Sequence, residues 1–87
     1  CTCVNAALAN ILAGNNNEAL NKLNSGEQIP MAYYLKAVIG ARTNDDNMVM
    51  ENLRKACEGD ASLKAMAATD MEFAKYFENN DFVTITK

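Results

Sequence analysis

The 87-residue sequence contains no histidine and no tryptophan, only one proline and only four glycines. Without histidine, the chain lacks the side chain most often used for proton transfer and metal binding at neutral pH. Scarce proline and glycine, together with a hydrophobic content of 49%, are typical of a helical globular chain and not of a disordered one. The composition therefore predicts a small, ordered, helix-rich domain.

Clustered basic residues and long apolar runs are also missing. The formal net charge is −3, the pI is about 4.7, and the eight Lys and Arg residues are scattered from Lys22 to Lys87. Nucleic acids and anionic membrane surfaces attract clustered basic residues, so neither is expected as a partner. No apolar run approaches the roughly 20 residues that a membrane-spanning helix needs, and no signal peptide is visible. We therefore expect no direct membrane insertion.

Motifs for catalysis or metal binding are absent from the sequence. There is no glycine-rich phosphate loop, no serine in a nucleophile elbow and no cysteine with a plausible base partner. Cys1 and Cys3 form a C-x-C pair and Cys57 lies far away, whereas a structural zinc site takes four Cys or His ligands. Cys57 is expected to be a small buried apolar residue, and Asp45 and Asp46 to be capping groups. No enzymatic activity, metal or cofactor is expected.

The first residue, Cys1, has two interpretations. It could be the lipidated first residue of a mature bacterial lipoprotein, which is usually followed by a flexible polar tether. Here the helical pattern begins almost at once, which favours a segment cut from a longer repeat array.

The two halves of the chain resemble each other at an offset of 30 residues, which pairs Ala7 with Ala37, Gly14 with Asn44 and Leu23 with Leu53. Each half is predicted to be a helix, a polar turn and a second helix. Units of this kind cannot bury their apolar faces alone, so they stack on neighbouring units.

Apolar spacing predicts six helices, with approximate ranges 3–13, 15–26, 30–43, 46–59, 62–68 and 69–79. Gly14 is expected to end the first helix, and Pro30 to open the third. Thr69 followed by Glu72 predicts a capping box at the start of the last helix. The tail from Phe82 alternates like a strand, and we expect it to be a loose end anchored by that phenylalanine.

One stretch of the chain resembles a tetratricopeptide repeat, a helical hairpin of about 34 residues. The matching residues are Tyr33 to Arg42, Asn44-Asp45, Val49, Leu53, Ala56 and Asp60 to Ser62. Ala37 with Gly40 or Ala41 allows the second helix to approach closely, while Tyr33 and Leu53 fill the wider end. The first half is similar but degraded.

The resemblance implies an all-α fold of antiparallel helix-turn-helix repeats, stacked as a right-handed superhelix. The expected single domain, 1–87, has a degenerate repeat, a better-matched repeat, C-terminal capping helices and a tail, at 3–26, 30–60, 62–79 and 80–87. Ser62-Leu63-Lys64, Asp70 to Phe73 and Asn80 to Phe82 are similar to the closing helices of larger bacterial arrays, several of them associated with the cell envelope. This implies upstream domains in the same parent chain, and an envelope location, periplasmic or outer-membrane associated, over a cytoplasmic one.

In this family, ligands lie along the concave face formed by the first helix of each repeat. That face corresponds here to Val4, Leu8, Ile11, Leu12, Met31, Tyr34, Val38, Ala41 and Arg42. The resemblance therefore implies a protein or peptide partner in an apolar groove, with Tyr34 and Arg42 as anchors. Two alternatives stay open. Aromatic residues at helical spacing are often core residues, and the repeats could form a structural cap or a self-association segment without a ligand.

Overall fold

The computed structural model of this chain describes residues 9–25 and 29–87, and all regular secondary structure in these two stretches is helical. The expected all-α class is therefore confirmed. Residues 9–12 are helical, and the elements that follow are α2 (Asn16–Ser25), α3 (Pro30–Thr43), α4 (Asp46–Gly59), α5 (Ser62–Thr69), the 3₁₀-helix η1 (Met71–Tyr76) and α6 (Asn80–Thr86).

Several helix ends follow from single residues, as the sequence predicts. Gly14 has a φ of +85° in the turn before α2, a conformation that glycine adopts without steric cost. Pro30 begins α3, where its missing N–H loses no hydrogen bond. Asn44 ends α3 in the left-handed region, with a φ of 61°. Asp45 then caps α4, because its side chain accepts a hydrogen bond from the Met48 amide.

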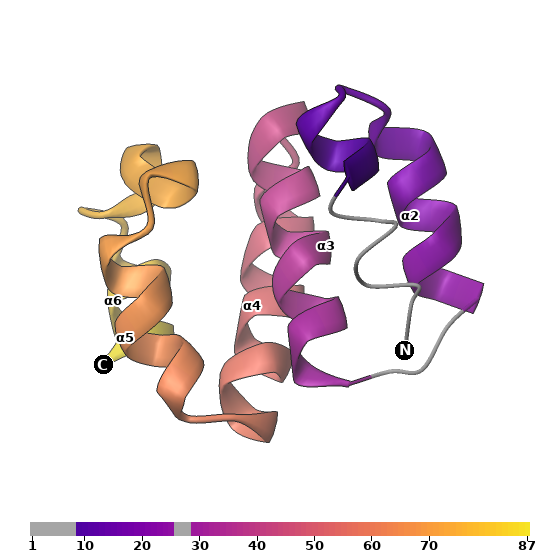
Figure 1. Cartoon of the computed structure of the whole chain (residues 1–87). Coiled ribbons are helices and arrows are strands. Elements are labelled where there is room, and N and C mark those ends of the chain that lie inside the picture. Colours follow the sequence, from indigo (N-terminus) through magenta and orange to yellow (C-terminus); the bar gives the residue numbers. More distant parts are fainter. Residues whose placement is uncertain (1–8, 26–28) are drawn as a thin grey trace.

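Helices α3 and α4 form an antiparallel hairpin that is the middle layer of the molecule (Figure 1). Gly40 marks one close approach between them. A Cβ atom at this glycine would lie 3.0 Å from Val49 Cγ2, 3.0 Å from the Val49 amide nitrogen and 3.1 Å from the Asp45 carbonyl oxygen. Ala37, one turn earlier, is completely buried. Small residues on α3 therefore allow the two backbones to meet, as expected.

Substituting Gly40 with alanine should destabilise the fold by about 1–2 kcal/mol, because overpacking against backbone atoms outweighs the better helix propensity of alanine. Urea denaturation followed by circular dichroism measures this difference. Gly59→Ala tests a second close approach of the two helices, because its added Cβ would lie 2.7 Å from Cγ of the rigid Pro30 ring, so this variant should lose stability as well. An alanine at position 40 that raised the stability would contradict the close approach described here.

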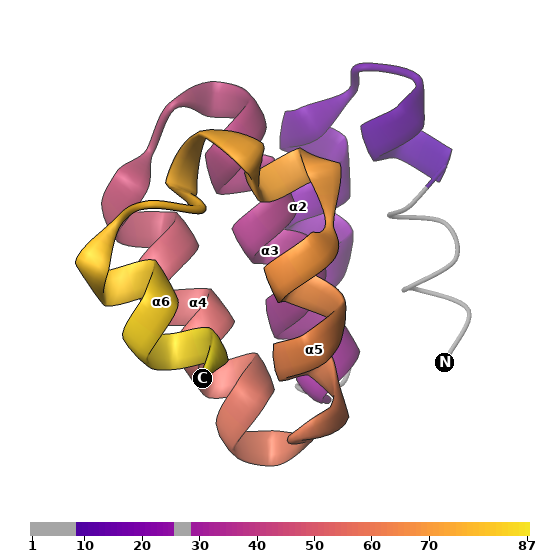
Figure 2. The ribbon, with the colours of Figure 1, turned by 90° about the vertical axis from the view of Figure 1, so that its left-hand side faces the viewer.

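The C-terminal elements cover the side of the hairpin opposite α2 (Figures 1 and 2). Helix α6 packs on α4 and α5, while η1 packs on α3. Their aromatic side chains enter the core: Phe73 is 0% exposed and Phe82 is 2% exposed. The ring centroids of these two residues lie 5.8 Å apart. The described helices thus form three layers around one apolar core.

The tail from Phe82 was expected to be a loose end, and this prediction is wrong. It forms helix α6 instead, and Asn79 caps that helix by accepting hydrogen bonds from the Asp81 and Phe82 amides. The anchoring role expected of Phe82 is correct, since its side chain is buried. The β-branched residues Val83 to Thr86 favour an extended chain locally, but the cap and the burial of Phe82 outweigh that preference.

The predicted capping box between Thr69 and Glu72 is also wrong. Asp70 caps the next element, since its carboxylate accepts a hydrogen bond from the Glu72 amide. Thr69 remains the last residue of α5, and its hydroxyl donates to the Ala65 carbonyl oxygen. The element that follows is the short 3₁₀-helix η1 and not an α-helix over 69–79. The cap therefore lies one residue later than the sequence pattern suggests.

Candidate functional site

The residues expected to line a concave groove are found in different environments. Val4 and Leu8 lie outside the described residues. The core takes up most of the others: Ile11, Tyr34, Val38 and Ala41 are buried, and Met31 is partly buried. Leu12 is 70% exposed. Arg42 lies at the surface with its side chain about one-third exposed. The structure thus gathers few of these side chains on an open face.

Tyr34 is held in the interior by both its ring and its hydroxyl group. Its ring meets Phe73 edge-on, with centroids 5.5 Å apart and an interplanar angle of 83°. Its hydroxyl donates a hydrogen bond of 2.6 Å to Asp70 Oδ2. Burial, and then the hydrogen bond to Asp70, raise the pKa of the phenol far above its usual value. Tyr34 is therefore a core residue in this fold, as the alternative interpretation of the sequence proposed.

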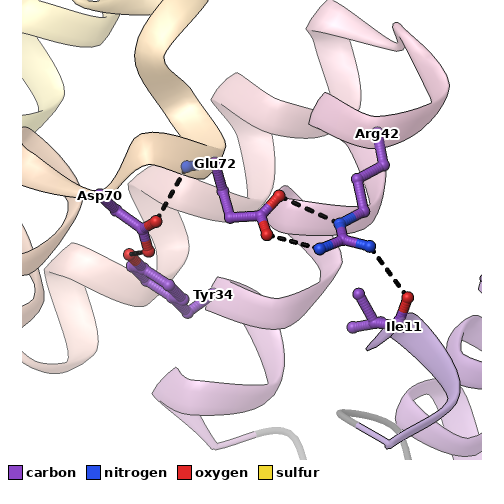
Figure 3. A network of polar contacts seen from close by, with 5 residues as sticks. All are labelled: Ile11, Tyr34, Arg42, Asp70 and Glu72. Atoms are coloured by element: carbon purple, nitrogen blue, oxygen red, sulfur yellow. Dashed lines mark hydrogen bonds and ion pairs between the residues drawn. The ribbon is translucent and has the colours of Figure 1, made fainter. Parts of the chain in front are cut away.

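Arg42 joins three parts of the chain (Figure 3). Its Nε and Nη2 donate to the two carboxylate oxygens of Glu72 at 3.0 and 2.6 Å. Its Nη1 donates to the Ile11 carbonyl oxygen at 3.0 Å. The bidentate pairing with Glu72 raises the pKa of the guanidinium group. The second expected anchor is therefore engaged within the chain, between residues 9–12, α3 and η1.

Further polar contacts tie η1 to the turn between α3 and α4. The Lys75 ammonium group donates to the Ala41 carbonyl oxygen at 2.9 Å, and also to Asn44 Oδ1. The Tyr76 hydroxyl donates to Asp46 Oδ1 at 2.6 Å. We call the whole set the latch: Tyr34 with Asp70, Arg42 with Glu72, Lys75 with Ala41 and Asn44, and Tyr76 with Asp46. The latch fixes the C-terminal segment on the hairpin.

The latch makes the stability of the chain sensitive to alkaline pH. Burial and the hydrogen bond to Asp46 raise the pKa of Tyr76 to about 12, and the pKa of Tyr34 is raised as well. Above about pH 10 an unfolded chain releases these phenolic protons while the folded chain retains them. The unfolding free energy should therefore be unaffected by these tyrosines below pH 10 and should fall as the pH rises toward 12.

Urea titrations at increasing pH measure this fall, and tyrosinate absorbance reports the ionisation. The Tyr76→Phe variant is the control, because it removes one of the two groups and should lose part of the slope. An unchanged slope in this variant would contradict the role of Tyr76 in the latch.

Within residues 9–25 and 29–87, no set of three or more Cys, Asp or Glu side chains is placed to hold a metal ion. None of the described helices has the length and apolar character to cross a membrane. Cys57 is buried, and burial raises the pKa of its thiol, so it acts as an uncharged apolar group as expected.

Comparison with protein-family models, curated proteins and solved structures finds no match to this chain. Its fold and the latch define it as an all-helical domain in which the C-terminal segment is fastened to a central helical hairpin. In the sequence, the carboxylates of the latch were noted only as capping groups or for the resemblance of residues 70–73 to closing helices, and no signal indicated Lys75.

Proposed function

We propose that this chain is a non-enzymatic helical-repeat module of the tetratricopeptide type, and that its C-terminal helices close the repeat stack. The hairpin of α3 and α4 is the repeat unit in this proposal. Each of these helices has 14 residues, and the tight Asn44-Asp45 turn joins them. The close contact at Gly40 supports the assignment. Helix α2 and the helical residues before it take the place of the degenerate repeat.

The observation that carries the capping role is the coverage of α3 by segment 70–76. In the family, this side of the first helix faces a ligand, but here Phe73 lies against Tyr34, and Glu72 pairs with Arg42. The outer positions of the segment that follows are polar and exposed: Glu78, Asn79, Asn80 and Asp81. A polar outer face over an apolar end is what a terminal repeat needs to remain soluble.

The test is to remove the cap and then restore it. A chain ending at Asp70 lacks η1 and α6, so it should expose the apolar side of α3 and either unfold or self-associate. Circular dichroism and multi-angle light scattering distinguish these outcomes. Adding the peptide 71–87 should restore a folded complex of one shortened chain and one peptide. A shortened chain that stays folded and monomeric, with unchanged stability, would contradict the capping role.

A partner-binding module is the second candidate, and two exposed apolar side chains favour it. Leu12 is 70% exposed and Met71 is 75% exposed. They adjoin in sequence Ile11 and Glu72, the two residues that Arg42 contacts. A partner would then dock on this outer surface, with its apolar side chains next to the ion pair, and not in a groove along α3.

The second candidate is tested by affinity capture, with a Leu12→Ser/Met71→Ser double variant as one bait and the unaltered chain as the other. These substitutions are at exposed positions, so they should leave the helix content intact. Loss of a captured protein from the folded double variant would support docking at this surface. Equal capture by both baits would contradict docking at this surface, and the capping role would be the remaining proposal.

A further inference from the structure

A cavity of about 240 Å³ lies where α4, α5 and α6 meet, a region that the latch does not use. Its lining residues are Arg54, Cys57, Glu58, Lys64, Thr84 and Ile85. A second cavity of about 320 Å³ continues along α4 and α6 and shares Arg54, Thr84 and Ile85 with the first. Figure 2 shows α6 beside α4 and α5, the arrangement that creates this groove.

The groove follows from helical periodicity. On α4, Met50, Arg54 and Glu58 recur every four residues and Cys57 comes three residues after Arg54, which places them on one side of the helix. On α6, Asp81, Thr84 and Ile85 form the matching side. The short side chains of Cys57 and Thr84 leave the space between the two helices unfilled. Lys64, from α5, borders the first cavity only.

The groove has two basic side chains, Arg54 and Lys64, that are not paired with other described residues of the chain. Other basic residues are engaged: Arg42 with Glu72, Lys55 with Glu51, and Lys75 with Ala41 and Asn44. The side chains of Arg54 and Lys64 make no hydrogen bond or ion pair with any described residue. Glu58 is the only acidic residue that borders the first cavity. The lining of that cavity therefore carries one net positive charge.

We propose that this groove binds a monovalent organic carboxylate with an apolar tail. The guanidinium group of Arg54 offers paired donors that match a carboxylate, and the Lys64 ammonium group adds a second positive charge. The tail lies against Cys57 and Ile85 and extends toward Met50. The first cavity, with one net positive charge, suits a single carboxylate and leaves the second charge of a phosphate dianion uncompensated, while Asp81 borders only the second cavity. The site lies apart from the latch and does not depend on the capping role.

The test uses the whole chain and hexanoate, with amide chemical shifts as the readout. Shifts should be confined to residues around Arg54, Lys64 and Thr84. Hexanamide has the same tail without charge, and inorganic phosphate has charge without a tail, so both should bind more weakly. Arg54→Gln should weaken hexanoate binding at least roughly tenfold, since a charged hydrogen-bonding partner is lost.

Lys55→Gln is the matched control variant. It makes the same change of charge at the neighbouring position of α4, where the ammonium group lies 5.5 Å from the centre of the Tyr33 ring and outside the groove. Hexanoate affinity should be unchanged in this variant. Shifts spread over the whole molecule, equal losses in both variants, or phosphate binding as strong as hexanoate binding would overturn the proposal.

Two sources could supply such a carboxylate, a small organic acid or the C-terminus of a peptide ending in an apolar residue. A short peptide with a free C-terminus and its amidated form distinguish them. Stronger binding of the free peptide than of hexanoate, and none of the amide, supports a peptide terminus. Binding of hexanoate without the peptide supports a small acid. Binding of neither the peptide nor hexanoate would overturn the proposal.

Discussion

Replacing Phe73 with alanine is expected to lower the unfolding free energy by about 3–5 kcal/mol, as measured for large aromatic residues in cores. The Phe73 ring is 0% exposed and contacts both Tyr34 and Phe82. Its loss would leave a cavity where η1 meets α3 and α6. Because small domains have only about 5–15 kcal/mol of stability in total, this variant should lose much of its helix content at moderate urea concentrations.

Met71→Ala, in the same 3₁₀-helix, is the control for the Phe73 substitution. Met71 is 75% exposed, so its truncation should change the stability by no more than about 0.5 kcal/mol. Urea denaturation of both variants and the unaltered chain provides the comparison. Similar, small losses at both positions would show that η1 contributes little to the core, contrary to the structure.

The second large effect is expected at Tyr34, where alanine should cost about 2–4 kcal/mol. This residue was expected from the sequence to be an anchor for a partner, but its ring and hydroxyl are both engaged by the C-terminal segment. A surface anchor could be removed with little effect on folding. A large loss of stability in Tyr34→Ala therefore supports the core role.

Tyr34→Phe separates the contribution of the ring from that of the hydroxyl group. It keeps the packing against Phe73 and removes the hydrogen bond to Asp70, so the expected loss is about 1 kcal/mol. Thermal or urea unfolding of the two variants gives both contributions. If Tyr34→Ala were as stable as the unaltered chain, the position of η1 against α3 would be wrong.

The helical class and the central hairpin could be predicted because their signals are local. Pro30 can begin a helix without losing a hydrogen bond, and Asp45 can cap one from its own side chain. Gly14 can adopt the positive φ of the turn that ends the helical residues before it. Each of these effects depends on a few neighbouring residues, so the sequence alone was sufficient.

The C-terminal elements depend on contacts that local patterns do not contain. Val83 to Thr86 have strand-like alternation, yet the Asn79 cap and the burial of Phe82 make this segment a helix. The cap of η1 lies at Asp70 instead of Thr69. In both places, tertiary packing overrides the local preference of the chain.

The burial of most residues expected to line a groove could not be predicted for a related reason. Helix α3 is in the middle layer, and nine of its residues are buried: Ala32, Tyr34, Leu35, Lys36, Ala37, Val38, Ile39, Gly40 and Ala41. Apolar periodicity cannot identify an open face on a helix that is covered on most sides. The contacts Tyr34–Asp70 and Arg42–Glu72 join residues separated by 36 and 30 positions. Helical spacing gives no information about such distant pairs.

Native-state hydrogen exchange tests the central claim that the C-terminal segment is an integral cap and not a lid that opens alone. The amides to compare are those of Phe73 in η1 and Val83 in α6, which donate to Asp70 and Asn79, and that of Val38 in α3. An integral cap predicts opening free energies that agree within about 1 kcal/mol, because all three would exchange through global unfolding. Fast exchange at Phe73 and Val83 while Val38 remains protected would contradict this account and show a face of α3 that a partner can reach.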